Sequence, residues 1–526
     1  MMRIVFLILI ASRTVMAQGV DAHWPTAAKN GFGTSTSLTS KVWFTLANGV
    51  MTEVFFPTLD VPNVQTLQLQ VAIGGKVETE LEDTLHRVEP ALNALTFRQI
   101  NNAKSGQYTI TKTYITDPRR NTVLIDVDFD SRAHVQLSVY YDPSLNNSGM
   151  HDSAWSEGDA LLAVDGNKAS ALIPSCGFAE VTGIAKGNVV QIGQLKGKQC
   201  TLALGFGETA AQAATAARLS LARGFEATRR EYEAGWRSYV SRLPRIANHQ
   251  RQFNMAAMVL KGLEDKTFRG ASIASPSTPW GGGPNANEPT VSGYHGVWAR
   301  DLYHVATAFD AMGDRATALR LLDYLFRVQQ KRDGSFPQNS WVDGRPIGGG
   351  LQMDQVSLPL VLAYQLARND KTTWTKHIKP AADFIVRRGP RTDQDRWEEK
   401  PGYSPATIAA QIAGLVCAAE IASINGDKSS AKKYLDTADN WAENVEKWTA
   451  TGTGHRARGY YLRITDDDDP NDGAKMEINS SSLVVDERKI LDAGFLELVR
   501  LGVKDPRDEL IVESLKLIDQ MIGVET

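Results

Sequence analysis

The sequence predicts two folded parts, an N-terminal antiparallel β-sandwich followed by an all-α domain. Residues 30–208 contain repeated runs of β-branched and aromatic residues that often alternate, separated by turn clusters such as the one at Gly74. Further along, apolar residues recur at helical spacing, and the segments stop at positions such as Gly313 and Gly426. Strands first and helices second are typical of two separate domains. A chain of 526 residues is long enough for two or three domains, each with its own core.

The β-sandwich is expected to occupy residues 18–208. Six runs rich in β-branched and aromatic residues fit its strands: 41–46, 53–56, 67–73, 108–115, 121–129 and 135–141. Residues 209–243 are rich in Ala and lack Pro, which favours one or two connecting helices. We therefore place a helical linker at 209–245.

The all-α domain is expected to occupy residues 246–526. About nine segments show helical periodicity: 247–264, 297–313, 315–330, 353–368, 372–389, 404–425, 429–448, 485–502 and 506–522. Several loops between them are long and contain Trp, Gly and Pro, so the chemistry is expected there.

Residues 1–17 fit a cleaved secretory signal. A short basic start ends at Arg3, an apolar run covers Ile4 to Ala11, and small residues precede a cleavage point after Ala17. The apolar run is shorter than the roughly 20 residues that span a bilayer. We therefore expect a secreted or periplasmic protein, with an uncleaved anchor as the alternative.

Composition narrows the classes of partner. The chain has 57 Lys and Arg against 60 Asp and Glu, a net charge of -3, which argues against a nucleic-acid binder. No stretch after the signal is long and apolar enough for a membrane span, so we expect no membrane association. Cys176 and Cys200 lie in the strand-rich region and could pair, a question that the sequence leaves open. No Cys and His spacing resembles a zinc site, and no metal is expected in the active site.

The first candidate motif is Trp298 to Asp301, which ends a Gly- and Pro-rich loop and starts a helix. Arg300 offers fork-like donors and Asp301 a carboxylate acceptor, a combination suited to vicinal sugar hydroxyls. The alternative is a helix-capping Asp beside a surface Arg.

The second candidate motif is the acidic pair Glu398 and Glu399, which follows Trp397 and precedes a Pro-Gly break. A carboxyl held against an indole and poorly solvated has a raised pKa, the condition for a general acid at neutral pH. The neighbouring carboxylate could hold sugar hydroxyls. The alternative is a solvated acidic pair before a helix.

Four Trp residues lie in loops between helices: Trp280, Trp298, Trp341 and Trp397. Trp341 belongs to a third long loop, residues 333–346. Aromatic faces cover the apolar side of a pyranose ring, while carboxylates and Arg bind its hydroxyls. A single Trp is more often part of a core, but four of them beside Arg, Asp and Glu indicate a sugar-binding site.

These motifs resemble glycoside hydrolase family 15, in its bacterial glucoamylase and glucodextranase branch. The resemblance is carried by residues 31–49 near the N-terminus, 293–303 around Arg300 and 396–409 around Glu398. It implies an N-terminal β-sandwich, an (α/α)6 barrel, exo-acting release of glucose from the non-reducing ends of α-glucans, and inversion at the anomeric carbon. It does not choose between α-1,4 and α-1,6 linkages.

The resemblance also implies roles for single residues. Glu398 matches the general acid that protonates the glycosidic oxygen, and Glu399 a carboxylate that contacts sugar hydroxyls near the cleavage point. Arg300 and Asp301 match the pair that binds the terminal glucose, and Trp341 a Trp that stacks on the substrate. The expected substrate-binding residues are Arg300, Asp301, Glu399, Trp341, Trp397 and Trp298.

The family's general base has no match in this sequence. An inverting hydrolase needs a second carboxylate roughly 6.5–9.5 Å from the acid. In the family the base lies near the C-terminus, and the helices expected here fall about three short of a full barrel. Asp486 and Glu487 are expected on a structural helix and are not assigned to the role. We therefore expect a barrel that is incomplete at the C-terminus, and a chain that is inactive or unstable on its own.

The acidic stretch 466–473 raises the question of a structural calcium ion. With Asp467 as the first ligand, the EF-hand spacing places Asp472 where Gly is required and Ile478 where the bidentate Glu belongs. A solvated acidic turn is therefore expected, and no cofactor. Structural calcium in some members of the family keeps the alternative open.

The sequence thus predicts a monomeric hydrolase of α-glucans or of malto- and isomalto-oligosaccharides. Two other interpretations remain: a non-catalytic carbohydrate-binding protein that keeps the sugar pocket, and a phosphorylase or another hydrolase with a similar barrel. Sugar binding without turnover would favour the first, and phosphate-dependent cleavage the second.

Overall fold

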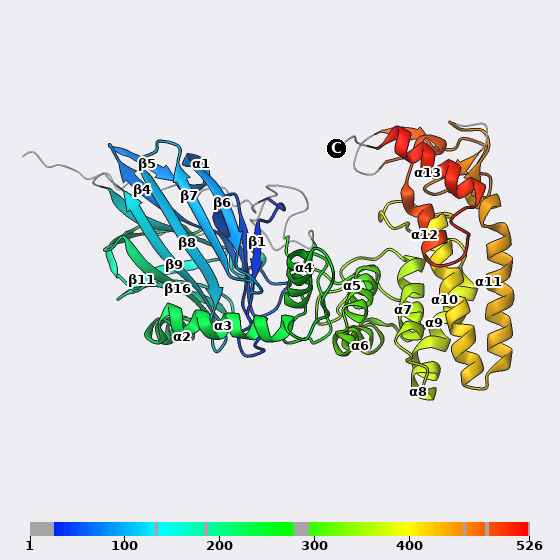
Figure 1. Cartoon of the computed structure of the whole chain (residues 1–526), viewed down its shortest axis with the longest axis horizontal. Helices are drawn as coiled ribbons and strands as arrows, with labels where there is room; N and C mark the ends of the chain where they lie inside the picture. The colour runs from blue at the N-terminus through cyan, green and yellow to red at the C-terminus, as the bar shows by residue number, and fades with distance from the viewer. Residues whose placement is uncertain are drawn as a thin grey trace, which may run out of the picture. The chain divides into compact units, whose positions relative to one another are not determined.

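The computed structural model describes residues 26–131, 135–183, 188–277, 294–455, 459–478 and 483–523. The chain divides into two compact units, Met1–Ser241 with Ser277–Gly293, and Arg242–Pro276 with Tyr294–Thr526. Strands dominate the first unit and helices the second, as the colours from blue to red show in Figure 1. The expected signal at 1–17 and Trp280 lie outside the described residues.

Two eight-stranded sheets with antiparallel pairing make up most of the first unit. The first has the order β1-β2-β3-β4-β10-β15-β14, with β5 paired to β4, and the second β11-β12-β13-β16-β9-β8-β7-β6. The first sheet consists of β1 (Gly31–Gly33), β2 (Trp43–Ala47), β3 (Val50–Phe55), β4 (Val64–Ile73), β5 (Lys76–Thr79), β10 (Gln136–Pro143), β14 (Phe178–Thr182) and β15 (Gln191–Leu195). The second consists of β6 (Thr84–Pro90), β7 (Phe97–Ala103), β8 (Tyr108–Thr116), β9 (Thr122–Ser131), β11 (Ser153–Glu157), β12 (Ala160–Asp165), β13 (Lys168–Pro174) and β16 (Gln199–Gly207).

Aromatic side chains fill the space between the two sheets. Phe44 on β2 contacts Phe97 on β7 and Tyr114 on β8, with ring centroids 6.5 and 5.8 Å apart. Because β2 belongs to one sheet and β7 and β8 to the other, these contacts join the layers. All three rings are buried, so apolar burial and ring contacts stabilise the sandwich together. The predicted β-sandwich is confirmed.

The two connecting helices pack on the sandwich. They are α2 (Ala210–Arg223) and α3 (Phe225–Val240). A Cβ at Gly205 of β16 would lie 2.3 Å from the carbonyl oxygen of Ala213, so only Gly allows α2 to approach this closely. On α3, the Trp236 indole donates to the Thr34 carbonyl at 2.8 Å. These helices therefore belong to the first unit.

A disulfide bond joins Cys176 and Cys200, whose Cα atoms are 5.4 Å apart. Cys200 lies on β16 of the second sheet, and Cys176 lies in the turn before β14 of the first. The pairing that the sequence left open is therefore present, and it links segments that belong to different layers.

Helices make up most of the second unit. Its elements are α4 (Gln250–Gly262), α5 (Ala299–Ala311), α6 (Arg315–Tyr324), η2 (Leu325–Gln329), α7 (Met353–Gln365), α8 (Lys371–Thr373), η3 (Trp374–Ile378), α9 (Lys379–Arg388), α10 (Pro405–Ile424), α11 (Lys428–Thr449), β17 (Ala450–Thr451), β18 (Tyr460–Tyr461), β19 (Lys475–Glu477), β20 (Val484–Asp486), η4 (Glu487–Lys489), η5 (Ala493–Phe495), α12 (Leu496–Arg500) and α13 (Glu509–Met521). The predicted all-α domain is confirmed, with small strands inserted after α11.

Helix α10 is the apolar centre of the second unit. It carries apolar residues all round because it packs against α7, α9 and α11. Gly414 permits the contact with α7, since an added Cβ would lie 3.0 Å from the Ser357 carbonyl oxygen. Contrary to the expectation that no later stretch is long and apolar enough, α10 has the length and composition of a membrane span, the one such helix within the described ranges. A mostly buried core helix meets the same criteria.

The segment 485–502, expected as one helix, is instead a series of short elements: β20, η4, η5 and α12. Asp486 accepts a hydrogen bond from the Arg488 N–H, and Asp492 accepts one from the Gly494 N–H. Side chains that cap their own turns in this way compete with a continuous helix. The prediction of a single helix here was wrong.

The acidic stretch 466–473 forms exposed turns. Asp467, Asp469 and Asp472 each accept a hydrogen bond from the backbone N–H two residues further along. In the part of the chain that the structure describes, no three His, Cys, Asp or Glu side chains converge to hold a metal ion.

Glu487, at the start of η4, is an acid in an unfavourable environment. Its side chain is buried. Its pKa is raised from 4.5 to about 8. Burial is the main cause, and the charges of the nearby Asp472 and Asp467 raise the pKa further. Between these two values the folded state holds a proton that the unfolded state has lost, so stability falls as pH rises through this window.

We expect Glu487→Gln to remove this contribution, because the amide stays neutral at every pH. The variant should melt like the wild type near pH 5 and at a higher temperature than the wild type near pH 8. The corresponding difference in the free energy of unfolding is up to about 1.4 kcal/mol for each pH unit crossed. Thermal melts from pH 4.5 to 8.5 measure it, with the exposed Glu443→Gln on α11 as the control. The same pH slope in Glu487→Gln and in the wild type would contradict the assignment.

Candidate active site

The acidic pair lies in the loop between α9 and α10. A β-bridge between Thr392 and Gly402 closes the base of this loop. Glu398 adopts a left-handed backbone with a φ of 64°, and its N–H donates to the Asp395 carbonyl at 2.9 Å. This conformation is rare for a residue with a side chain and costs on the order of 1–2 kcal/mol, so the surroundings must enforce it.

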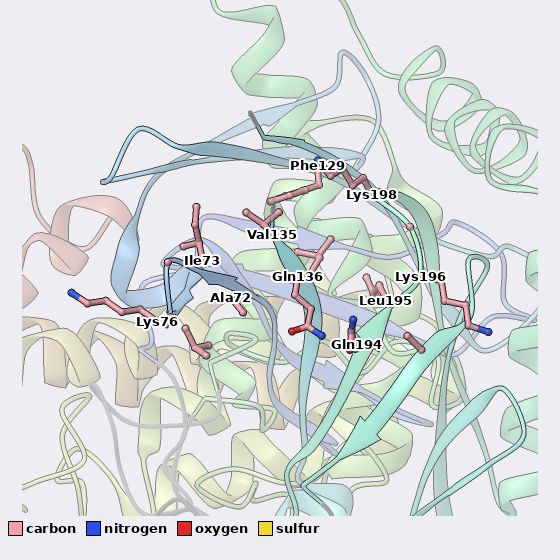
Figure 2. Close-up of a pocket in the computed structure, with 16 residues that line it drawn as sticks. Ala72, Ile73, Lys76, Phe129, Val135, Gln136, Gln194, Leu195, Lys196 and Lys198 are labelled. Atoms are coloured by element: carbon pink, nitrogen blue, oxygen red, sulfur yellow. The ribbon is translucent and has the colours of Figure 1, made fainter. Parts of the chain in front are cut away.

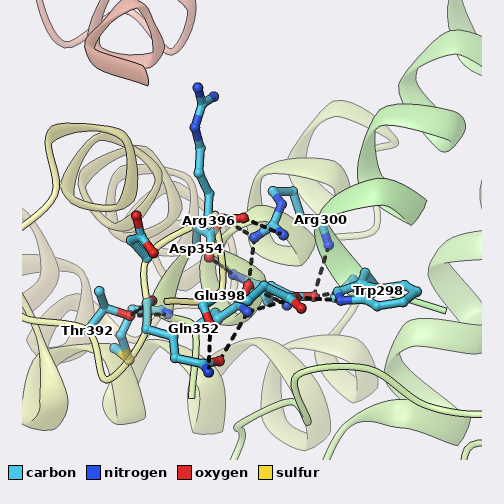
Figure 3. Close-up of polar contacts among 12 residues, drawn as sticks. Trp298, Arg300, Gln352, Asp354, Thr392, Arg396 and Glu398 are labelled. Carbon is cyan, nitrogen blue, oxygen red and sulfur yellow. Dashed lines mark hydrogen bonds and ion pairs between the residues drawn. The ribbon is translucent and has the colours of Figure 1, made fainter. Parts of the chain in front are cut away.

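Three side-chain N–H groups hold the Glu398 carboxyl, as Figure 3 shows in part. Its Oε1 accepts from the Trp298 indole at 2.6 Å and from Gln352 Nε2 at 3.0 Å. Its Oε2 accepts from Gln338 Nε2 at 2.7 Å. The side chain is half-buried, so it is fixed in direction but still reachable from solvent.

Arg300 and Asp301 lie in the first turn of α5, whose Ala299 N–H donates to Gln355 Oε1 at 2.7 Å. Arg300 Nη1 donates to Gln352 Oε1 at 2.7 Å and to Asp354 Oδ2 at 2.9 Å. The Arg300 side chain is only 18% exposed. It is therefore not the surface Arg of the alternative interpretation.

The pKa values of Arg300 and Asp301 also differ from those of surface residues. Burial raises the pKa of Asp301, although the charge of Arg300 acts in the opposite direction. Burial disfavours the charge on Arg300, but Asp354 and Asp301 outweigh it and leave the pKa of Arg300 above its ordinary value. A permanent cation thus lies beside two carboxyl groups, which provides donors and acceptors for sugar hydroxyls.

Gln352 joins the acid to this pair. Its amide oxygen accepts from Arg300, and its amide nitrogen donates to Glu398 (Figure 3). Arg300 Nη2 also donates to the Arg396 carbonyl at 3.3 Å, two residues before the acid. The structure therefore brings together the two motifs that the sequence placed about 100 residues apart.

Glu399 faces a different partner from Glu398. Its Oε2 pairs with Arg463 Nη2 at 2.7 Å, and Arg463 Nε donates to Asp395 Oδ2, also at 2.7 Å. Asp395 is fully buried and accepts from the backbone N–H groups of Glu399 and Lys400. Arg463 therefore holds the loop both before and after Glu398.

The Trp residues have different environments. The indole that contacts the acid is Trp298, which is 7% exposed, and not Trp397, as the sequence had suggested. Trp397 is 56% exposed, and its indole donates to Asp492 Oδ2 at 2.7 Å. Trp341 is half-buried, with its ring centroid 5.8 Å from that of His295.

The residues that sequence reasoning missed are mostly neutral amides and distant partners: Gln338, Gln352, Gln355, Arg463 and Asp492. Gln338 lies in the loop 333–346, so this loop takes part in the site through an amide as well as through the predicted Trp. Amides have no charge or spacing that marks them in a sequence. The signal available for them was that Gln338 lies in the loop 333–346 and that Gln352 and Gln355 follow this loop closely in sequence.

A separate cavity of about 900 Å³ opens in the first unit, where β4, β10 and β15 begin or end (Figure 2). Lys76, Lys196 and Lys198 line it together with apolar residues such as Phe129. Its described lining residues include no Trp and no carboxylate. This chemistry differs from that of a sugar pocket, so the candidate active site is the one in the second unit.

Comparisons with protein families divide the chain in the same way. Residues 15–184 and 179–241 match the family described as "Glucodextranase, domain N". Residues 249–525, more than half of the chain, match "Glycosyl hydrolases family 15".

Individual relatives agree with these matches. Over 550 residues the chain is 38% identical to a glucoamylase of Clostridium sp. (strain G0005), covering 97% of this chain and 78% of that protein. An uncharacterized glycosyl hydrolase of Methanocaldococcus jannaschii is 29% identical over 160 residues, which is 29% of this chain and 25% of that protein. The crystal structure of a bacterial glucoamylase complexed with acarbose aligns with a TM-score of 0.91 at 36% identity, covering 96% of this chain and 80% of that one. The chain therefore belongs to glycosyl hydrolases family 15 and is a glycoside hydrolase by descent.

Proposed function

We propose that this hydrolase acts on α-glucans from their non-reducing ends and releases glucose with inversion. The observation that carries the proposal is the Gln352 amide, which places the proton donor Glu398 beside the Arg300 and Asp301 pair. That arrangement suits one terminal sugar whose outer hydroxyls are held while its glycosidic oxygen faces the acid. The glucoamylase name of the Clostridium relative supports an α-glucan as the substrate.

In this mechanism Glu398 protonates the glycosidic oxygen as the bond to the leaving sugar breaks. Its Oε1 accepts two hydrogen bonds and its Oε2 one, which leaves Oε2 with capacity for the transferable proton. Arg300 and Asp301 bind the hydroxyls of the terminal glucose and fix the position of the bond that breaks. Glu399 contacts the next sugar, and the exposed face of Trp397 is a platform for it.

Inversion also requires a carboxylate that activates water on the opposite face of the sugar. We assign no residue of this chain to that role.

We expect Glu398→Gln to lower glucose release from maltotriose by roughly 10²–10⁴-fold, because the amide keeps the shape but cannot donate a proton. The affinity for maltotriose, measured by calorimetry, should change by less than about threefold, since ground-state binding is retained. The exposed Glu443→Gln on α11 is the matched control. Glucose release by Glu398→Gln at the wild-type rate would exclude Glu398 as the acid.

The same experiment separates the proposal from the carbohydrate-binding alternative. A wild-type chain that binds maltotriose and releases glucose above the Glu398→Gln background supports a hydrolase. Binding with no release above that background supports a carbohydrate-binding protein. A β-anomer as the first product supports inversion, whereas an α-anomer contradicts it.

Gln352→Ala tests the link between the acid Glu398 and the Arg300 and Asp301 pair, which we call the clamp. The change removes one acceptor of Arg300 and one donor to Glu398, so we expect the affinity for maltotriose to fall about tenfold, as for the loss of a charge-assisted hydrogen bond. Calorimetry measures the affinity, and Gln365→Ala, at the exposed end of α7, is the control. Unchanged affinity in Gln352→Ala would show that the link does not hold the clamp in its binding geometry.

We also propose that the protein is exported, from the signal pattern at residues 1–17. Expression of the full chain in a bacterium with a signal peptidase should give a mature protein that begins at Gln18 and lies outside the cytoplasm. N-terminal sequencing of the fractionated protein checks this. An intact Met1 in the soluble cytoplasmic fraction would contradict it.

A further inference from the structure

Asp492 lies just before η5, and its carboxylate is directed at the catalytic loop. Arg396 Nη2 donates to both of its oxygens at 3.1 Å, and the Trp397 indole donates to Oδ2 at 2.7 Å. Its Oδ1 also accepts from the Gly494 N–H at 2.5 Å. Asp492 is 9% exposed, so these bonds form largely out of water, where a charged acceptor is strong.

These contacts fall on the two residues that precede Glu398. The residues on either side of this stretch, Asp395 and Glu399, are held by Arg463. The loop is thus held by two distant residues: Asp492 binds Arg396 and Trp397 just before the acid, and Arg463 binds the loop both before and after the acid. A left-handed residue such as Glu398 relaxes to a commoner conformation unless its neighbours are held, and this double attachment holds them.

Asp492 also influences the clamp through the main chain. The Arg396 carbonyl accepts from Arg300 Nη2, so a shift of Arg396 would move an acceptor of the clamp as well as the acid. The Trp397 indole is held at its nitrogen by Asp492 and has the Arg396 guanidinium over its ring, while the residue stays 56% exposed. The Asp492 carboxylate therefore affects three parts of the site: the acid Glu398, the clamp residue Arg300 and the Trp397 indole.

We propose that Asp492 is a positioning residue of this active site, which fixes Glu398 for proton transfer and presents the face of Trp397 to the sugar beyond the cleaved bond. The inference rests on the proposed function. Asp492 itself touches neither the acid nor, in this scheme, the reacting atoms; it acts through Arg396 and Trp397. A displacement of about 1 Å at the reacting groups can cost about 10²-fold in rate, so loss of this attachment should be visible in kcat.

Two substitutions separate positioning from folding. Asp492→Ala removes every bond of the carboxylate, whereas Asp492→Asn keeps its shape and one oxygen that can accept from Trp397 or Gly494 but loses the charge that pairs with Arg396. The matched control is Asp393→Asn, in the same loop, because Asp393 forms an exposed ion pair with Arg388. The measurements are kcat and KM on maltotriose, maltotriose affinity by calorimetry, and the melting temperature.

We expect kcat to fall about 10–100-fold in Asp492→Ala and by a smaller factor in Asp492→Asn, with the affinity for maltotriose about tenfold weaker in Asp492→Ala. The melting temperature of Asp492→Asn should stay close to that of the wild type and of Asp393→Asn. A purely structural role would instead lower the melting temperature and leave kcat per folded molecule unchanged, and that result would overturn the proposal.

The same measurements separate a failure of the proposed role of Asp492 from a failure of the proposed function. If the wild type hydrolyses maltotriose and both Asp492 variants match it in kcat and in affinity, Asp492 has no positioning role while the proposed function stands. If turnover is too slow to compare, the maltotriose affinities decide, and equal affinities overturn the proposal. If the wild type neither binds nor hydrolyses maltotriose, the proposed function fails and the role of Asp492 falls with it.

Discussion

The site depends on one neutral side chain, the Gln352 amide. An amide can accept from a cation and donate to a carboxyl group at the same time, and Gln352 does both, toward Arg300 and Glu398. A charged residue in its place would favour one partner and repel the other. Because the link is neutral, it holds Glu398 and Arg300 in a common geometry without favouring either of them. The rigid starts of α5 and α7 provide the framework for this link.

Much of the fold could be predicted from the sequence, because it follows from local patterns. Period-two alternation marked the sandwich and helical periodicity marked the second unit. The pattern failed at 485–502, where the apolar spacing suits a helix but Asp486 and Asp492 cap separate turns. A side chain that bonds to its own backbone overrides a periodicity that only reports burial.

The candidate site was predictable only where residues stand next to each other in sequence. The Arg300 and Asp301 pair and Glu398 were predicted because their chemistry and their adjacency coincide, and the structure brings them together. Trp397 was placed against the acid for the same reason, yet the left-handed backbone of Glu398 turns its carboxyl toward Trp298 instead. Partners that fold in from far along the chain, and amides without charge, leave no trace in a local pattern.

The attachments of the catalytic loop have a consequence for the order of events during synthesis. Arg463 follows Glu399 by 64 residues, and Asp492 follows Arg396 by 96. At roughly 5–20 residues per second, a ribosome needs on the order of 3–20 s to add these partners after the loop itself has been made. Helices α5 to α10 can pack within that interval, because their contacts are already present in the nascent polypeptide. The acid therefore acquires its final orientation late, when the last loop-holding residues emerge from the ribosomal tunnel.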